Sequence, residues 1–188
     1  YAWSPDAHTR PFHEPLEIDT VDATAGHITN LDLWLDRDGR AYLLYLKQPV
    51  QTALMRDRFF PDRKMTRSLE CVMVNRGRVE ERMTLMTGGE GLDGPDPHYA
   101  RFQATPEGAL YVVFTAGLLN SGRQPVVETR IQRILPRRGD VATIPLQQPF
   151  STFFTATERG GSKSSRLLDL YGTGQQGNPL RYARIQLE

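Results

Sequence analysis

Apolar and polar residues alternate with a period of two along most of this chain, which is the pattern of half-buried β-strands. Two stretches carry the pattern in matching form: residues 32–45 are DLWLDRDGRAYLLY and residues 101–114 are RFQATPEGALYVVF. In each, an acidic residue followed by glycine separates two apolar runs, so each predicts a β-hairpin. The two glycines, Gly39 and Gly108, are 108 − 39 = 69 residues apart. This spacing is typical of a repeat of about four strands.

A repeat of four short strands is the size of a propeller blade, and no helical periodicity lasts long enough to predict a long helix. We therefore predict an all-β chain, a β-propeller of four-stranded antiparallel blades with about three blades present. The predicted blade boundaries are a blade end at 1–26, blades at 27–86 and 95–147, and a closing blade at 150–188. The predicted strands are residues 1–3, 15–19, 31–36, 41–46, 69–74, 79–85, 99–104, 110–115, 127–135, 141–146, 152–157, 167–171 and 180–187.

The strand count at the two ends of the chain does not close a ring. The start contributes two predicted strands and the end contributes three, where one blade needs four. We therefore expect the C-terminal part of a larger propeller, whose remaining blades come from another segment or chain. A half-ring that dimerises is the alternative. The chain begins at Tyr1 rather than Met, so we also expect a mature or trimmed product.

Composition narrows the classes of partner. The net charge of +1 gives no support for a nucleic-acid-binding surface, and no apolar run approaches the length of a membrane span. The single cysteine, Cys71, lies in the apolar run LECVMV and is expected to be a buried hydrophobic residue. The four histidines lack metal-ligand spacing, and no phosphate-binding glycine motif occurs. We expect neither a metal nor a cofactor.

Polar residues at the start of the first strand of each blade form one candidate site. Asn30 and Asp32 alternate with leucines and are expected to share one side of their strand. His98, Tyr99 and Arg101 open the corresponding strand of the next blade, where Asp32 aligns with Arg101. A histidine, a tyrosine and an arginine near a propeller axis supply a base, an acid and a carboxylate clamp. The alternative is that these residues satisfy backbone groups and each other.

The long connection QPVQTALMRDRFFPDRKMTR forms a second candidate site. Arginine offers a bidentate fork to a carboxylate, and aromatic faces stack on sugar rings, so the segment suits an anionic sugar. The expected substrate-binding residues are Asn30 together with Arg56, Arg58, Phe59 and Arg63. The alternative is that the aromatic residues fix the loop while its charges are solvated. A third set, Glu158, Arg159, Lys163 and Arg166, fits a solvated hairpin better.

The residues Ser4-Pro5-Asp6-Ala7-His8-Thr9-Arg10-Pro11-Phe12 resemble a degenerate Asp-box of the sialidase-like propeller superfamily, whose members carry bacterial neuraminidase (BNR) repeats. The stretches 154–162 and 181–185 also resemble closing-blade sequence of such proteins. In an Asp-box, the serine and aspartate side chains hold a tight turn by hydrogen bonds to nearby backbone, so Ser4 and Asp6 are expected to be structural. The resemblance covers nearly the whole chain as a blade pattern.

The resemblance implies a carbohydrate-active propeller acting on an acidic glycan, either a sialidase-like glycoside hydrolase or a polysaccharide lyase. A sialidase would use Arg101 with Tyr99 or Tyr182, whereas a lyase would use His98, Tyr99 and Arg101, and Asp32 completes the expected catalytic set. The expected partner is an acidic oligo- or polysaccharide, with no nucleic acid and no membrane, and the expected location is secreted or periplasmic. The alternative function is a non-catalytic propeller that binds glycan or protein.

Overall fold

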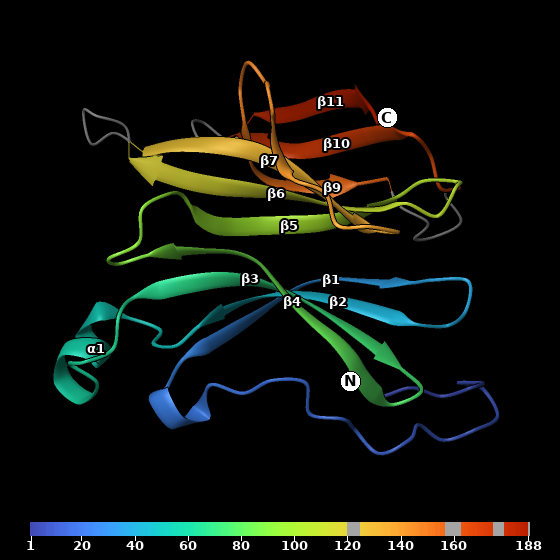
Figure 1. The fold of residues 1–188 in the computed structure, drawn as a ribbon, viewed down its shortest axis with the longest axis horizontal. Coiled ribbons are helices and arrows are strands. Elements are labelled where there is room, and N and C mark those ends of the chain that lie inside the picture. The colour runs from blue at the N-terminus through green and yellow to red at the C-terminus, as the bar shows by residue number, and fades with distance from the viewer. Residues whose placement is uncertain (120–124, 157–162, 175–178, 188) are drawn as a thin grey trace. The chain divides into compact units, whose positions relative to one another are not determined.

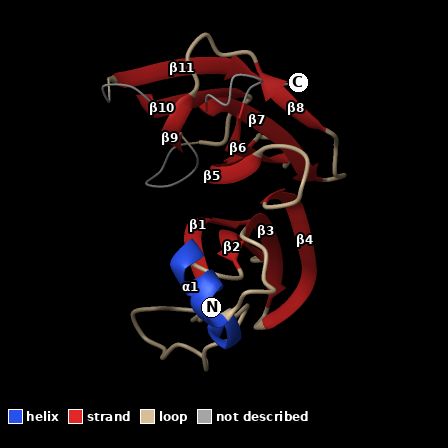
Figure 2. Ribbon diagram, turned by 90° about the vertical axis from the view of Figure 1, so that its left-hand side faces the viewer, coloured by secondary structure: helices blue, strands red, loops and turns tan. Residues whose placement is uncertain are grey.

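The computed structural model describes residues 1–119, 125–156, 163–174 and 179–187. Its regular structure is almost entirely β-strand, arranged in antiparallel sheets (Figure 2). The backbone divides into two compact units, Tyr1–Leu85 (unit 1) and Met86–Glu188 (unit 2). The predicted all-β class is confirmed, and all eleven strands predicted downstream of residue 30 form. Closure of the sheets into a propeller stays a prediction, as do the blade boundaries.

Unit 1 is built on one four-stranded sheet in which each strand pairs with the next along the chain (Figure 1). Its strands are β1 (His27–Leu35), β2 (Ala41–Gln48), β3 (Thr66–Asn75) and β4 (Arg78–Gly89). Cys71 lies in β3 and is fully buried, as its apolar surroundings in the sequence predict. Short glycine turns join β1 to β2 and β3 to β4, as read from the sequence, whereas the connection between β2 and β3 is longer.

A β-bulge interrupts β1 and corrects one prediction. The register shifts between Asn30 and Asp32, so that Asn30 pairs with Tyr45 while Asp32 pairs with Leu44. Tyr45 and Leu44 are consecutive in β2 and point to opposite faces, and directly paired residues share a face. Asn30 and Asp32 therefore lie on opposite faces of the sheet. The predicted common side is wrong because strict alternation does not hold across a bulge.

The N-terminal segment forms a turn held by side chains. Ser4 Oγ donates to the backbone oxygen of Arg10 at 3.0 Å, and Asp6 accepts from the backbone N–H of His8 at 3.0 Å and from the Thr9 hydroxyl. The predicted structural role of Ser4 and Asp6 is confirmed. Tyr1 and Leu16 exchange backbone hydrogen bonds across this turn, at 2.8 and 2.7 Å.

The two stretches that this turn joins, residues 1–3 and 15–19, are paired but are not β-strands, which corrects the prediction for them. Too few consecutive backbone bonds link them to make a regular ladder. Their apolar side chains pack on one face of the unit 1 sheet. The cluster there comprises Ala41, Tyr45, Val72 and Val74, with Tyr1, Leu16, Ile18, Ile28, Leu43 and Val79 packed against it.

Asp19 ties the N-terminal segment to β2. Its carboxylate accepts from the Tyr45 hydroxyl at 2.9 Å and from Lys47 Nζ at 2.7 Å. Burial alone would raise the pKa of Asp19, but the hydrogen bonds from Lys47, Tyr45 and the backbone N–H of Thr20 outweigh it and lower the pKa. Burial, followed by the hydrogen bond to Asp19, raises the pKa of Tyr45 well above its usual value.

The connection between β2 and β3 contains the helix α1 (Ala53–Phe59), where the sequence predicts only a long loop. Thr52 caps the helix, because its side chain accepts from the backbone N–H of Met55 at 3.3 Å. Two turns are too short for hydrophobic periodicity to register, so the cap residue is the signal that sequence reasoning missed. A short 3-10 turn, Asp22–Thr24, precedes β1.

Unit 2 contains two sheets, again with sequential order. The first comprises β5 (Asp96–Ala104), β6 (Leu110–Leu119), β7 (Pro125–Leu135) and β8 (Val141–Ile144). The second comprises β9 (Phe150–Thr155), β10 (Leu167–Gly174) and β11 (Leu180–Gln186). Leu135 and Pro136 are joined by a cis peptide bond between β7 and β8.

The two sheets of unit 2 pack face to face around an apolar core. Tyr99 of β5 meets Phe153 of β9 edge-on, with ring centroids 5.4 Å apart. The Thr155 hydroxyl donates to the backbone oxygen of Phe102 at 2.8 Å, so β5 and β9 lie side by side. The buried residues of this core are Val113, Ile144, Phe150, Phe153, Leu168, Leu170 and Leu187.

The repeated hairpin of the sequence is repeated in its hydrogen bonds as well. In the first hairpin the backbone N–H of Asp36 donates to the backbone oxygen of Arg40 at 3.0 Å. In the second, the backbone N–H of Thr105 donates to the backbone oxygen of Ala109 at 2.9 Å. Gly39 and Gly108 occupy the same left-handed conformation, with φ of 80° and 85°. Glycine is needed at both positions because other residues rarely adopt this conformation. The predicted pair of hairpins is confirmed.

Candidate functional site

Tyr99 and Arg101, two of the predicted catalytic residues, lie on one face of β5 and are in contact. Arg101 Nη2 donates to the Tyr99 hydroxyl, and the guanidinium carbon lies 4.5 Å from the centroid of the Tyr99 ring. The same guanidinium lies 5.3 Å from the ring centroid of Phe154 on β9. Arg101 is thus held between two aromatic rings, an arrangement that fixes its position at the edge where the two sheets meet.

His98 precedes this pair at a bulge in β5, where the register shifts between Pro97 and Ala100. Its side chain is exposed and lies against Gly117 of β6. A Cβ atom at position 117 would lie 2.6 Å from His98 Nε2, so glycine there makes room for the imidazole. His98 therefore lies near the start of β5, directly before Tyr99, with its imidazole against Gly117 of β6.

Asp32 and Asn30, the remaining residues of the first predicted set, belong to unit 1. Asp32 is half-buried and its carboxylate accepts from the backbone N–H of Leu33 at 2.6 Å, whereas Asn30 is exposed. The four predicted catalytic residues are thus divided between the units, Asp32 in unit 1 and the other three in unit 2. The grouping of Asp32 with the other three stays a prediction.

The predicted basic-aromatic segment is centred on α1 in unit 1. Arg56 is half-buried and pairs with Asp57 at 2.5 Å, which engages its charge within the helix. Arg58 lies 5.2 Å from the ring centroid of the exposed Phe59. Arg63 follows the helix and is exposed. Arg58, Phe59 and Arg63 therefore remain accessible to a ligand, and their role in binding stays a prediction.

Part of the third predicted set, Glu158 and Arg159, lies outside the described residues. Lys163 is exposed. Arg166 forms an exposed ion pair with Glu107 at 2.7 Å. This contact links the segment before β10 to the hairpin that follows β5, and it agrees with a structural role for Arg166.

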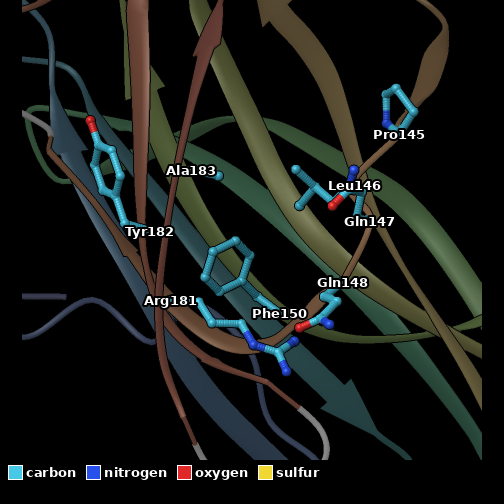
Figure 3. A pocket seen from close by; sticks show the side chains of 8 residues that line it. All are labelled: Pro145, Leu146, Gln147, Gln148, Phe150, Arg181, Tyr182 and Ala183. Atoms are coloured by element: carbon cyan, nitrogen blue, oxygen red, sulfur yellow. The ribbon is translucent and has the colours of Figure 1, made fainter.

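A pocket that the sequence analysis did not predict lies at one end of unit 2, where β8 leads into β9 and β11 begins. Its volume is about 480 Å³. Figure 3 shows Arg181 beside Phe150 and Gln148, with Tyr182 on the other side of β11. Among the described residues that line the pocket, none is acidic. The lining consists of Pro145, Leu146, Gln147, Gln148, Phe150, Arg181, Tyr182 and Ala183.

Arg181 is the only charged residue of that lining. Within the described part of the chain, no hydrogen bond or ion pair engages its guanidinium, although the residue is half-buried. The guanidinium lies against the backbone of Gly174 on β10, where a Cβ atom would be 2.3 Å from the guanidinium carbon. The absent side chain at position 174 is therefore what gives Arg181 its place.

No protein-family model, curated protein or solved structure matches this chain. Within these residues, no group of three histidine, cysteine or acidic side chains is placed to hold a metal ion. The same residues contain no helix that is long and apolar enough to cross a membrane.

The sequence does hold a signal for Arg181. Arg181, Ala183 and Ile185 alternate along β11, with Leu187 directly after the strand, and this side faces the core of unit 2. An arginine at the end of an otherwise apolar row is unusual, because a charge is rarely directed toward a core without a partner. This arginine at the end of an apolar row, rather than any sequence motif, is the signal in the sequence that indicates the pocket.

Proposed function

We propose that this chain is part of a sialidase-like propeller and binds an acidic glycan in the Arg181 pocket. The observation that carries the proposal is Arg181, a half-buried residue that lines a cavity without an acidic side chain among its described lining residues. Keeping a charge partly out of water is costly unless something compensates it. A ligand carboxylate is the matching group, since the guanidinium fork binds carboxylates through two parallel hydrogen bonds.

The other lining residues suit a sugar. Gln147 and Gln148 offer amide donors and acceptors for hydroxyl groups, and Pro145 and Leu146 offer an apolar surface. The lining thus combines apolar surface with polar groups that can orient a ligand. A carboxylate-bearing sugar, a uronic or sialic acid residue, presents all three kinds of contact within one ring.

The propeller part of the proposal is supported by the way the sheets follow one another. Each sheet runs in sequential order, and in unit 2 the first strands of the two sheets, β5 and β9, lie side by side. Neighbouring blades of a propeller are related in this way. The pocket lies at the end where one sheet leads into the next, and connections on a rigid β-scaffold are where binding residues gather.

Binding of acidic sugars to the whole chain tests the proposal. Isothermal titration with galacturonate, glucuronate and sialic acid is compared with titration of the matching neutral sugars. Arg181→Gln is expected to weaken binding of the acidic sugar about tenfold or more, since a hydrogen bond to a charged group is worth about 1.5–3 kcal/mol. Arg78→Gln, which removes an exposed charge from unit 1, is the matched control and should leave the affinity unchanged. Equal binding of acidic and neutral sugars would refute the proposal.

A lyase is the second candidate, and the contact between Arg101 and the Tyr99 hydroxyl favours it. A tyrosine beside an arginine, with His98 adjacent in sequence, supplies an acid, a carboxylate clamp and a base for proton abstraction next to a uronate carboxylate. Ultraviolet absorbance of unsaturated uronates would detect the product. Absence of this absorbance on a broad panel of acidic polysaccharides leaves binding without turnover as the function.

A further inference from the structure

The helix α1 of unit 1 carries two strongly exposed apolar side chains. Leu54 is 78% exposed, the highest value among the large apolar residues of the described chain, and Phe59 at the end of the helix is 59% exposed. The helix lies in the connection between β2 and β3 and is drawn in blue in Figure 2. Exposed apolar side chains that gather on one short element indicate a surface that meets a partner.

Basic side chains surround these two apolar residues. Residues 52–67 contain five basic and two acidic residues, so the segment has a net charge of 5 − 2 = +3, whereas the whole chain has a net charge of +1. The rest of the chain therefore has a net charge of 1 − 3 = −2. Positive charge is thus concentrated in this connection, and such a segment attracts an anionic surface.

Three of the basic residues are available to a partner. Arg58, Arg63 and Lys64 are exposed, and within the part of the chain that the structure describes no ion pair engages their side chains. Arg58 lies 5.2 Å from the ring centroid of Phe59, so a positive charge and an exposed ring are held together. The apolar and the basic groups therefore form one mixed surface.

The helix is formed without any ligand. The backbone N–H of Arg56 donates to the backbone oxygen of Thr52 at 3.0 Å, and the backbone N–H of Phe60 donates to the backbone oxygen of Arg56 at 2.8 Å. The residues Arg56 and Phe60 are half-buried, so one side of the helix is partly covered and the other is left to the solvent. An element preformed in this way loses little conformational entropy when it docks.

We propose that α1 and residues 60–64 form a docking surface for an anionic lipid bilayer, with the helix in the plane of the membrane surface. Leu54 and Phe59 enter the boundary between headgroups and acyl chains, and the basic residues meet the lipid phosphates. An element that lies in this plane needs no apolar run of spanning length. The proposal does not rest on the glycan site, since α1 belongs to unit 1 and Arg181 to unit 2.

The exposed leucine favours a bilayer over the other anionic partners. An aliphatic side chain gains nothing from a hydrated acidic polymer, whereas the acyl boundary of a bilayer takes it out of water. A protein partner needs more area than the helix offers. Seven residues form a helix about 10 Å long, too short to supply by itself the roughly 800 Å² that a stable protein interface buries on each partner.

Flotation with lipid vesicles tests the docking surface. Vesicles of phosphatidylglycerol and phosphatidylcholine in equal amounts are compared with vesicles of phosphatidylcholine alone. The whole chain should bind the anionic vesicles about tenfold or more tighter than the neutral ones. Binding should weaken when salt is raised from about 0.1 M to about 1 M, because the screening length falls from about 10 Å to about 3 Å.

Substitutions of exposed residues assign the binding to this surface. Phe59→Ser and Leu54→Ser should each weaken binding to anionic vesicles about three- to fivefold, because each removes a side chain that enters the bilayer. Arg63→Gln combined with Lys64→Gln should weaken it about tenfold or more, since each basic residue near an anionic surface contributes about fivefold. Phe12→Ser is the matched control, because Phe12 is 61% exposed but lies in the N-terminal turn, and it should leave binding unchanged.

The remaining outcomes overturn the proposal. Absence of binding to anionic vesicles refutes it directly. If Leu54→Ser and Phe59→Ser bind the vesicles as tightly as the wild type, and soluble dextran sulfate competes for binding, the surface is a site for soluble polyanions. If Leu54→Ser changes the oligomeric state in light scattering without weakening vesicle binding, the helix packs on a second copy of the chain. An equal loss of binding in Phe12→Ser would show that any exposed ring suffices.

Discussion

The link between Asp19 and β2 allows a quantitative prediction about unit 1. Asp19→Asn keeps the size of the side chain and removes its charge. The carboxylate accepts from Lys47 at 2.7 Å and from Tyr45 at 2.9 Å, and the Asp19 and Lys47 side chains are 19% and 33% exposed. An exposed ion pair would contribute under about 1 kcal/mol, whereas a hydrogen bond to a charged, partly buried group contributes about 1.5–3 kcal/mol. The asparagine retains one acceptor for Tyr45, so we expect a loss of about 1–2 kcal/mol at pH 7.

The sign of the pH dependence follows from the lowered pKa of Asp19. A carboxylate whose pKa is lower in the folded protein than in the unfolded chain stabilises the fold above the unfolded value of about 3.9. This contribution is lost as the pH falls from there through the folded value. The difference between the wild type and Asp19→Asn should therefore be full at pH 7 and at pH 5, and should shrink as the pH is lowered below about 4.

Both tryptophans of the chain, Trp3 and Trp34, belong to unit 1, so tryptophan fluorescence follows the unfolding of this unit alone. Urea titrations at pH 7, 5 and 3 would give the free energy of unfolding of each variant. Asp22→Asn is the matched control, because Asp22 is exposed in the turn before β1. A difference between wild type and Asp19→Asn that is equal at pH 7 and pH 3 would refute the account of this network.

Two further predictions concern the core of unit 2 and the N-terminal turn. Phe153→Ala removes a fully buried ring and should destabilise unit 2 by about 3–5 kcal/mol in thermal unfolding followed by circular dichroism, whereas the exposed neighbour Phe154→Ala should cost less than about 1 kcal/mol. Similar costs for the two would contradict the assigned strand faces. Asp6→Ala removes the acceptor of the His8 N–H and the Thr9 hydroxyl, so faster amide hydrogen exchange at His8 is expected, and unchanged exchange would contradict the hydrogen bonds described.

The strands of this chain could be predicted from sequence because the signals are local. Gly39 and Gly108 mark hairpins by a requirement for positive φ that acts within a few residues, and strand alternation does the same. The bulge in β1 could not be predicted, because it depends on the register with β2, and it moved Asp32 to the face opposite Asn30. Local patterns specify elements, whereas registers are set by pairing across the sheet.

In the candidate site, too, local features could be predicted from the sequence and features set by folding could not. Tyr99 and Arg101 are two residues apart on one strand, so the sequence could place them near each other, whereas their hydrogen bond emerges from the structure. The Arg181 pocket depends on how β11 lies against β10 and on the connection before β9, which are brought together only by folding. Its residues belong to no motif, and the sequence therefore showed the predicted closing strand without showing the pocket beside it.

One glycine at the end of β10 has a consequence for how the proposed glycan site would change over time. A Cβ atom at position 174 would lie 2.3 Å from the guanidinium carbon of Arg181, so Arg181 keeps its place because Gly174 has no side chain. If the pocket binds a glycan as proposed, selection for a different ligand would act directly at position 174, where any larger residue would displace the arginine. Position 174 would then set ligand preference through Arg181 rather than through a side chain of its own.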